Sequence, residues 1–356
     1  MKVLVINTAP TGFTGITGVM LNYIRVTAEA VGYDFVLAGN VDPKRRDELQ
    51  QYGEDIYIPP CSRVKNPLQY TSWLIKKMRL KKYAAVHVHG NSGTMFFEMY
   101  AAKRAGIPVR ICHSHSSSCK FMLAHRVLKP LMNRIKTVGI ACSDKAGDWL
   151  FSGDYVLLGN GIDITRFRFD PQIRQQYRQE LGLKDNFVVG HIGYMDTEKN
   201  HTYLLRVFEE LCKVRPDSKL LLIGDGRLRP QVEEQFRQSG LQKNVLVLGK
   251  RYDAAQLYQC MDVFVLPSLY EGLPVSLVEA QTAGLPCVVS AAVTRQVDLV
   301  NNMQFVGIDE DDRGKWVEAI LRECSADRIS CGEAMEKSAF NIQNCASTLL
   351  KLYGVD

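Results

Sequence analysis

The sequence predicts two doubly wound α/β domains, each built around a parallel sheet. Short, continuous apolar runs alternate with helix-length amphipathic segments almost throughout the chain. Continuous apolar strands of this kind are typical of parallel sheets that helices cover on both faces. The pattern occurs twice, and a turn-rich stretch, LGNGID at 158–163, separates the two halves. A chain of 356 residues is long enough for two such domains with separate cores.

Each half supplies runs with the composition of buried strands. In the first half they are VLVIN (3–7), FVLAG (35–39), DIYIP (55–59), AVHVHG (85–90), PVRICH (108–113) and GIACS (139–143). In the second half they are FVVGHIG (187–193), KLLLIG (219–224), VLVLG (245–249), VFVLP (263–267), PCVVS (286–290) and FVGI (305–308). The motifs AGIP at 105–108 and AGLP at 283–286 end two of the intervening helices. We predict domains at 1–164 and 165–338, with a helix at about 339–356 that packs back on the first domain or stays with the second.

Bulk composition is typical of a soluble globular protein, with 46% apolar and 23% charged residues. No apolar run reaches the length of a membrane span, and the five-residue run near the start is too short for a signal-peptide core. We therefore expect a cytoplasmic protein. The ten cysteines include no CxxC pair. Cys112, Cys142, Cys260 and Cys287 fall in apolar segments, which indicates buried free thiols rather than disulfides or a zinc site.

Positive charge is concentrated in the first half of the chain. Residues 1–166 carry 22 Lys and Arg against 12 Asp and Glu, a balance of +10, and the remainder carries 22 against 26, a balance of −4. The basic residues do not alternate with aromatics as in RNA-binding signatures, so we expect no nucleic-acid partner. An anionic substrate or an anionic membrane surface would be attracted by this positive charge.

The segment SLYEGLPVSLVEAQTAGLP (268–286) places two carboxylates eight positions apart in apolar surroundings. Glu271 follows a predicted strand directly, at the edge where ligands bind in such sheets. The amides of Gly272 and Leu273 then lie at a helix start, where amides bind phosphate or hydroxyl oxygens. Glu279, about one and a half turns into the helix, would contact a second point of an elongated ligand such as a sugar. The spacing fits equally well a Glu271 that favours the helix dipole and a Glu279 paired with a lysine.

Two loops in the second half have a strand–glycine–helix layout. In HIGYMDTEKNH (191–201) the strand ends at Gly193 and Lys199 opens a helix. A lysine there opposes the helix dipole, which favours a bound anion, although a solvated lysine is the alternative. GDGRLRP (224–230) repeats the layout with Arg227.

Two features of the first half also follow strands. Gly12, Gly15 and Gly18 follow the first strand with GxxGxxG spacing, which differs from the GxGxxG of dinucleotide-binding enzymes but permits close approach of a diphosphate. ICHSHSSS (111–118) places His113 and His115 at a strand end and on the same side of it. No third zinc-type ligand is apparent from the sequence, and an isolated pair also fits buried structural histidines.

Together these motifs resemble the family 4 glycosyltransferases, which have the GT-B fold of two Rossmann-like domains facing each other across a cleft. EGLPVSLVEAQTAGLPCVVS matches the E-x7-E motif of that family. LLGNGID, DTEKNHTYLL and LLIGDG resemble its interdomain signature, its lysine motif and the strand that follows. NYIRVTAEAVGYDFV, ICHSHS and ACSDKAGDWLFSG resemble the branch that builds exopolysaccharide and capsule. The resemblance covers nearly the whole chain.

For the second domain, the resemblance implies contacts with a nucleotide-sugar donor. Glu279 would hold the ribose of the nucleotide. Glu271, together with the amides of Gly272 and Leu273, would hold the hydroxyls of the donor sugar. Lys199 would neutralise the leaving diphosphate.

For the first domain, the resemblance implies that Gly15 lets the backbone close on the diphosphate. A histidine at the end of the ICH strand, His113 or His115, would lie beside the donor sugar. His89 and Asn91, at the end of the AVHVHG run, would lie on the acceptor side.

The sequence departs from the family pattern at two places. The family usually has arginine after the glycine that corresponds to Gly193, whereas this chain has Tyr194, and its double glycine reads Thr14-Gly15. Either Arg227 or Arg251 replaces the missing positive charge, or activity is low.

The implied reaction moves a hexose from a nucleotide-diphosphate sugar, a UDP-sugar, to a glycan or lipid-linked acceptor in surface polysaccharide synthesis. It proceeds with retention of configuration and without a metal or other cofactor. No DxD motif lies at a strand end, and we expect the DED at 309–311 in an exposed loop. Two other classes stay open. One is a same-fold sugar-nucleotide epimerase or phosphorylase, and the other is a catalytically weakened partner subunit that binds nucleotide sugars.

Acceptors in this branch are usually lipid-linked, so we expect peripheral binding at the inner face of the cell membrane. Two basic amphipathic stretches, 66–83 and 120–136, would supply it. Their apolar residues are Tyr70, Trp73, Leu74, Ile75 and Met78 in the first and Phe121, Met122, Leu128 and Leu131 in the second. A helix that flanks a sheet has the same pattern, with solvated lysines on its outer face.

Overall fold

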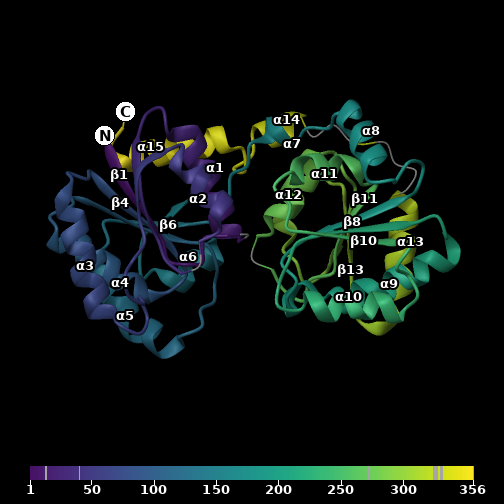
Figure 1. The fold of residues 1–356 in the computed structure, drawn as a ribbon, viewed down its shortest axis with the longest axis horizontal. Helices are drawn as coiled ribbons and strands as arrows, with labels where there is room; N and C mark the ends of the chain where they lie inside the picture. Colours follow the sequence, from purple (N-terminus) through teal and green to yellow (C-terminus); the bar gives the residue numbers. More distant parts are fainter. Residues whose placement is uncertain (13, 40, 272, 324–327, 329–331, 356) are drawn as a thin grey trace. The chain divides into compact units, whose positions relative to one another are not determined.

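A computed structural model of the chain describes residues 1–356 except 13, 40, 272, 324–327, 329–331 and 356. The chain forms two compact units. Unit 1 comprises Met1–Gly161 and Ile342–Asp356, and unit 2 comprises Ile162–Asn341. The boundaries predicted at 164 and 338 are close to these, and the C-terminal helix belongs to unit 1 (Figure 1).

Unit 1 contains a seven-stranded sheet in the order β3-β2-β1-β4-β5-β6-β7, and neighbouring strands are parallel. The strands are β1 (Lys2–Asn7), β2 (Gly32–Leu37), β3 (Gly53–Tyr57), β4 (Ala85–Gly90), β5 (Val109–Ser114), β6 (Val138–Ala141) and β7 (Val156–Leu157). The helices are α1 (Gly15–Thr27), α2 (Pro43–Gln50), α3 (Pro67–Leu80), η1 (Gly93–Met95), α4 (Phe96–Arg104), α5 (Met122–Ile135), α6 (Asp144–Leu150) and α15 (Ile342–Tyr353). In Figure 1 the yellow helix α15 lies beside the purple helix α1.

Unit 2 contains a six-stranded sheet in the order β10-β9-β8-β11-β12-β13, also with parallel neighbours. The strands are β8 (Val188–Ile192), β9 (Lys219–Ile223), β10 (Val245–Gly249), β11 (Val263–Leu266), β12 (Cys287–Ser290) and β13 (Met303–Val306). The longer helices are α8 (Pro171–Glu180), α9 (His201–Val214), α10 (Arg229–Gln238), α11 (Ala254–Cys260), α12 (Val275–Thr282) and α13 (Arg313–Glu323). The short ones are α7 (Ile164–Phe167), η2 (Thr197–Lys199), η3 (Arg295–Val297), η4 (Glu310–Asp312) and α14 (Gly332–Glu336).

Local sequence explains where several helices begin and end. The side chains of Thr14, Asp42 and Ser143 each accept a hydrogen bond from an amide in the first turn of α1, α2 and α6, as capping residues do. Gly106 and Gly284 follow α4 and α12 with φ of 82° and 70°, in agreement with the helix ends predicted from the AGIP and AGLP motifs.

Every predicted apolar run overlaps a strand, so the doubly wound pattern read from the sequence is confirmed. The two-residue strand β7 was not predicted, because its short apolar run leads directly into the turn-rich stretch at 158–163 that separates the two halves of the sequence. The four cysteines expected in apolar segments are buried free thiols. The acidic run at 309–311 is exposed, in the 3₁₀ turn η4 rather than in an irregular loop. Among the described residues, no helix is both long and apolar enough to cross a membrane.

The strand order sets where each sheet can hold a ligand. In unit 1 the chain reverses its direction of winding between β1 and β4, and in unit 2 it does so between β8 and β11. Ligands of open α/β sheets bind beyond the carboxyl ends of the strands at such switch points. The loops after β1 and β4 in unit 1, those after β8 and β11 in unit 2, and the adjacent loops after β5 and β9 are therefore the places to look for a site.

Candidate active site

In unit 2, the loops that follow β8 and β11 are joined at the switch point. The amide of Leu269, in the loop after β11, donates a 2.8 Å hydrogen bond to the carbonyl oxygen of Glu198 in η2. This contact brings the two loops that carry Lys199 and Glu271 to the same place at the sheet edge.

Lys199 and Glu271 form an ion pair there. The Nζ of Lys199 lies 2.6 Å from Oε1 of Glu271, and the Oγ of Ser268 donates to the same oxygen at 2.8 Å. The two charged side chains are only 17% and 15% exposed. The pairing differs from the alternative read from the sequence, in which a lysine would neutralise Glu279. The pair presents one cation and one carboxylate, already oriented, at the edge where ligands bind.

Glu279 lies in a different environment, inside α12. The Oη of Tyr258 lies 2.9 Å from its Oε2 and donates to it. Burial raises the pKa of Glu279 to about 7, although the hydrogen bond from Tyr258 and the positive charge of Arg166 act in the opposite direction. The two carboxylates of one motif therefore differ: Glu271 is paired with a lysine, and Glu279 titrates near neutral pH.

Close backbone packing beside the Lys199–Glu271 pair explains why positions 193 and 224 are glycines. The amide of Gly193 donates to the carbonyl oxygen of Ile223 at 3.0 Å, so the loop after β8 continues along β9. Gly224 has φ of 142°, and a Cβ there would lie 1.9 Å from the carbonyl oxygen of Gly193. A Cβ on Gly193 would touch the side chain of Lys199 at 3.0 Å. Glycine at both positions lets Lys199 cross the loop toward Glu271.

The arginines proposed to replace the missing family arginine are already paired. Arg227 Nε donates to Asp196 Oδ1 at 2.8 Å, and Arg251 Nε donates to Asp253 Oδ1 at 2.8 Å. The side chain of Tyr194 is 50% exposed. An anion at this edge would have to compete with two aspartates for these arginines.

The amide contacts predicted at the start of α12 stay predictions. Gly272 lies outside the described residues. Leu273 is half-buried and packs against the core of unit 2.

In unit 1, Gly15 is the first residue of α1. A Cβ at this position would meet no heavy atom within 4 Å. Packing within unit 1 does not require a glycine here, and open space adjoins it. This agrees with, but does not test, the predicted approach of a diphosphate.

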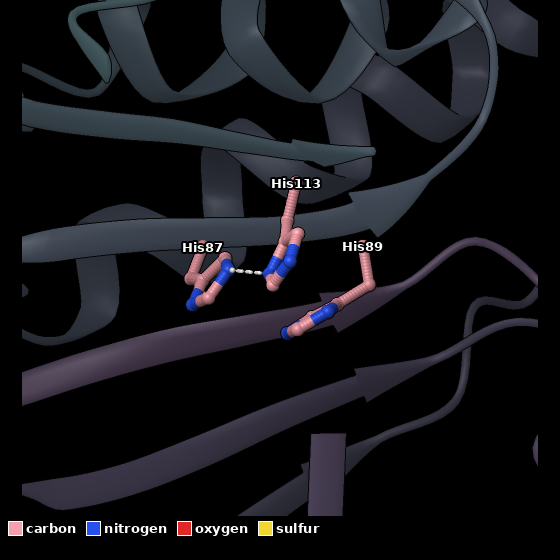
Figure 2. Close-up of side chains that lie close together, drawn as sticks. All are labelled: His87, His89 and His113. Carbon is pink, nitrogen blue, oxygen red and sulfur yellow. Dashed lines mark hydrogen bonds between the residues drawn. The ribbon is translucent and has the colours of Figure 1, made fainter. Parts of the chain in front are cut away.

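Four histidines form one layer against the sheet of unit 1: His87 and His89 on β4, and His113 and His115 from β5 (Figure 2 shows the first three). We call them the histidine layer. His89 is in register with His113 across the two strands. The Nε2 of His87 lies 3.2 Å from Nδ1 of His113, and the Nδ1 of His89 lies 2.9 Å from Nε2 of His115.

Only one of the two predicted donor-facing histidines has exposed surface. His113 is 0% exposed, whereas His115 is half-buried. A ligand could therefore reach His115 but could not touch His113 without rearrangement of the domain. Asn91 Oδ1 accepts a 3.0 Å hydrogen bond from the amide of His115, and its carbonyl oxygen accepts one from Trp149. His89 is 2% exposed, and its Nδ1 contacts the Nε2 of His115. Asn91 and His89 therefore both hold His115 in position.

The sequence reasoning missed His87. The signal was present, because histidines alternate in AVHVHG and in ICHSH, and alternate residues of a strand share one face. Recognising the layer required knowing that β4 and β5 are neighbours.

Comparisons with known proteins place this geometry in a family. A family model described as glycosyl transferases group 1 matches residues 173–327, which lie within unit 2. The putative glycosyltransferase EpsF of Bacillus subtilis (strain 168) is 33% identical over 362 residues, which cover 95% of this chain and 92% of that protein. The chain belongs to the group 1, or family 4, glycosyltransferases.

One further relative and one solved structure are also similar to this glycosyltransferase. The UDP-Gal:alpha-D-GlcNAc-diphosphoundecaprenol alpha-1,3-galactosyltransferase of Escherichia coli is 29% identical over 267 residues, which cover 70% of this chain and 68% of that protein. The crystal structure of Anabaena Alr3699/HepE in complex with UDP has a TM-score of 0.78 at 18% identity, covering 99% of this chain and 100% of that one. The two parallel sheets of the glycosyltransferase thus match the GT-B fold over the full chain, as the sequence predicted. The matched family region includes Lys199, Glu271 and Glu279.

We expect Glu279→Gln to stabilise unit 2, and to do so more at high pH than at low pH. A half-buried carboxyl with a raised pKa favours folding while it is protonated, and that contribution is lost as the pH rises through about 7. Glutamine keeps an oxygen for Tyr258 but cannot ionise. The gain in free energy of unfolding at about pH 8 should exceed that at about pH 5 by on the order of 2 kcal/mol, measured by urea denaturation.

Glu318→Gln is the matched control, because Glu318 is an exposed glutamate on α13 of the same unit. It should leave the pH dependence unchanged. A Glu279→Gln protein whose stability follows the parent at both pH values would show that this carboxyl is not held neutral by burial.

Proposed function

We propose that this glycosyltransferase moves a hexose from a UDP-sugar to a lipid-linked glycan during synthesis of a surface polysaccharide, with retention of configuration and without a metal in the transfer step. The observation that carries the proposal is the Lys199–Glu271 pair at the switch point of unit 2, with Glu279 on the helix that follows. The names of two relatives support the donor and acceptor classes: one acts on a diphosphoundecaprenol-linked sugar, and another was solved with UDP.

In unit 2, each member of the site meets a different part of the donor. The diphosphate replaces Glu271 as the partner of Lys199. It does so because a diphosphate bears more negative charge than the single carboxylate that is now paired with the lysine. Glu271 then accepts hydrogen bonds from hydroxyls of the sugar, with Ser268 still donating to it. Glu279 accepts from the ribose hydroxyls, and binding is strongest when this carboxyl is ionised, because a carboxylate is an acceptor only.

The chemistry asked of these residues is electrostatic. As the bond between the sugar and the diphosphate breaks, negative charge grows on the leaving phosphate and positive charge grows on the sugar ring. Lys199 stabilises the first, and Glu271 lies close to the second. The leaving phosphate itself accepts the proton of the acceptor hydroxyl on the same face, which accounts for retention. Preoriented charges of this kind supply much of the catalysis in many enzymes.

In unit 1, we assign the acceptor-side contacts to His115 and Asn91, and backbone approach to Gly15. His115 is the exposed end of the histidine layer, and Asn91 fixes its backbone. His113 and His89 act through His115 in this proposal, since neither has enough exposed surface to meet a sugar.

Helix α5 of unit 1 carries an apolar stripe that the core does not use. Leu123, Val127 and Leu131 follow one another at intervals of four residues and are 78%, 61% and 38% exposed, so they share one face of the helix. Arg126 and Arg134 are exposed near the same face. An apolar stripe flanked by arginines is suited to an anionic membrane surface, where a lipid-linked acceptor would be presented.

Helix α3, the other predicted surface helix, is different. Its apolar residues Tyr70, Leu74 and Met78 are buried in the core of unit 1. The ordinary interpretation of a helix packed on a sheet therefore explains α3, and the proposed membrane surface is restricted to α5.

A catalytically weakened partner subunit is the second candidate function. It is favoured by Tyr194 in the usual arginine position and by the aspartates that already hold Arg227 and Arg251.

Replacement of Lys199 or Glu271 by alanine tests the main proposal. Each should lower turnover about a hundredfold or more, the usual effect of removing a group that stabilises charge in the transition state. The measurement is release of UDP from a panel of UDP-sugars in the presence of acceptor lipid extract, with thermal melting as a check on folding.

Exposed residues of unit 2 provide the controls, Lys243→Ala for the lysine and Glu318→Ala for the glutamate. Both should keep full turnover. Full activity of Glu271→Ala would remove the basis of the proposed site, and conversion of the UDP-sugar into an isomer without transfer would point to an epimerase instead.

Tyr194→Arg should tighten binding of UDP about tenfold, because an added charge-assisted hydrogen bond to phosphate contributes roughly 1.5–3 kcal/mol. Calorimetric titration with UDP measures this, and Tyr194→Gln serves as the uncharged control. An affinity no better than that of the parent protein would mean that the diphosphate is already fully neutralised, which argues against the weakened-subunit candidate.

The membrane proposal predicts that the protein sediments with phosphatidylglycerol vesicles at low salt and is released at high salt, since each nearby basic residue contributes about 1 kcal/mol at an anionic surface. The triple variant Leu123→Gln, Val127→Gln, Leu131→Gln should bind much less.

Leu68→Gln with Leu80→Gln is the matched control, because both leucines are exposed on α3 of the same unit. Equal sedimentation with phosphatidylcholine vesicles, or an unchanged triple variant, would exclude α5 as the membrane surface.

A further inference from the structure

In the transfer reaction proposed above, His115 is the member of the histidine layer that contacts the substrate. The other three members are buried: His87, His89 and His113 are 1%, 2% and 0% exposed. One ring nitrogen of each lies within 4.8 Å of the corresponding nitrogens of the other two. Figure 2 shows the three rings converging from β4 and β5.

Tyr353 of α15 contacts the layer at His87. The Oη of Tyr353 lies 2.7 Å from Nδ1 of His87, and its ring packs against the ring of Tyr33 with centroids 6.5 Å apart. A histidine that donates through Nδ1 to such a hydroxyl keeps its lone pair on Nε2.

With Nδ1 of His87 donating to Tyr353, the Nε2 of His87 offers a lone pair on the side of His113. A histidine whose outer nitrogen donates to a fixed acceptor, with its inner lone pair directed into a cluster, has the usual arrangement of a metal ligand and its supporting group. Here Tyr353 of α15 is the supporting group.

The layer also contains a ring nitrogen with no partner. The Nε2 of His113 is buried and has no hydrogen-bond partner among the described residues. If Nδ1 of His113 donates to His87, its Nε2 is a buried lone pair. Leaving such a group unsatisfied costs roughly 1–3 kcal/mol, and an ion or water bound at the cluster is the ordinary explanation for it.

We propose that His87, His89 and His113 bind a divalent transition-metal ion, with Zn²⁺ the best match. Three imidazoles suit zinc, copper or nickel rather than magnesium or calcium. Zinc bonds of 2.0–2.1 Å in a tetrahedron place ligand nitrogens about 3.3 Å apart, and the three histidines already hold one nitrogen each within 4.8 Å of one another. The ion would join β4 to β5 beneath α15, a structural site apart from the transfer chemistry.

The test uses the full chain, purified without a polyhistidine tag and freed of metal by a chelator. Titration with Co²⁺ should give a saturable absorption in the visible range typical of tetrahedral cobalt, at one ion per chain, and equimolar Zn²⁺ should abolish it. Zinc should also raise the melting temperature, because a ligand that binds only the folded state stabilises it.

Two variants separate ligation from folding. His87→Asn keeps a nitrogen donor for Tyr353 but removes Nε2, and it should weaken cobalt binding at least tenfold. Tyr353→Phe retains every proposed ligand but removes the supporting acceptor, and it should weaken binding about tenfold. Circular dichroism in the presence of chelator shows whether each variant is folded.

His125→Asn is the matched control. His125 is a buried histidine of the same unit whose Nδ1 accepts from the amide of Gly93, outside the histidine layer, and its replacement should leave cobalt binding unchanged. No saturable cobalt binding by the folded parent protein would overturn the proposal. So would parental affinity in His87→Asn, or a thiolate-to-cobalt charge-transfer band, which would place the ion on cysteines.

Discussion

Parallel pairing of strands is the constraint on which the site of this glycosyltransferase depends. Strands covered on both faces must be apolar, so they leave little room for polar groups except at their ends. Because all strands of a sheet run the same way, those ends collect on one edge. Lys199 and Glu271, from loops 72 positions apart in sequence, meet there in unit 2. The same edge of unit 1 gathers Asn91 and His115 from the loops after β4 and β5.

Much of the architecture was predictable because its signals are local. Apolar runs mark the strands, glycine followed by proline marks helix ends, and the E-x7-E spacing places Glu271 at a helix start and Glu279 within the helix. The partners of these carboxylates were not predictable. Spacing along one segment cannot show that Lys199 pairs with Glu271 rather than Glu279, nor that Tyr258 from α11 reaches Glu279. Those contacts depend on how separate elements pack, as does the stacking of histidines from two neighbouring strands.

The same motif thus holds two carboxyl groups in opposite electrostatic conditions. Glu271 has a lysine and a hydroxyl directed at one oxygen. Glu279 lies in an apolar helix with a tyrosine, and burial outweighs that one hydrogen bond. Two acids that look equivalent in sequence can therefore respond differently to pH and to an incoming ligand.

The return of α15 to unit 1 has a consequence for how the protein is made. Unit 2 is an insertion within unit 1 in sequence. On the ribosome, unit 2 is therefore complete and can fold while unit 1 still lacks its last helix, since domains generally fold as units during synthesis. Until α15 emerges, the face of unit 1 that it covers is open, and His87 lacks Tyr353, its partner 266 positions further along the chain. Docking of α15 is therefore the step that completes the fold of unit 1.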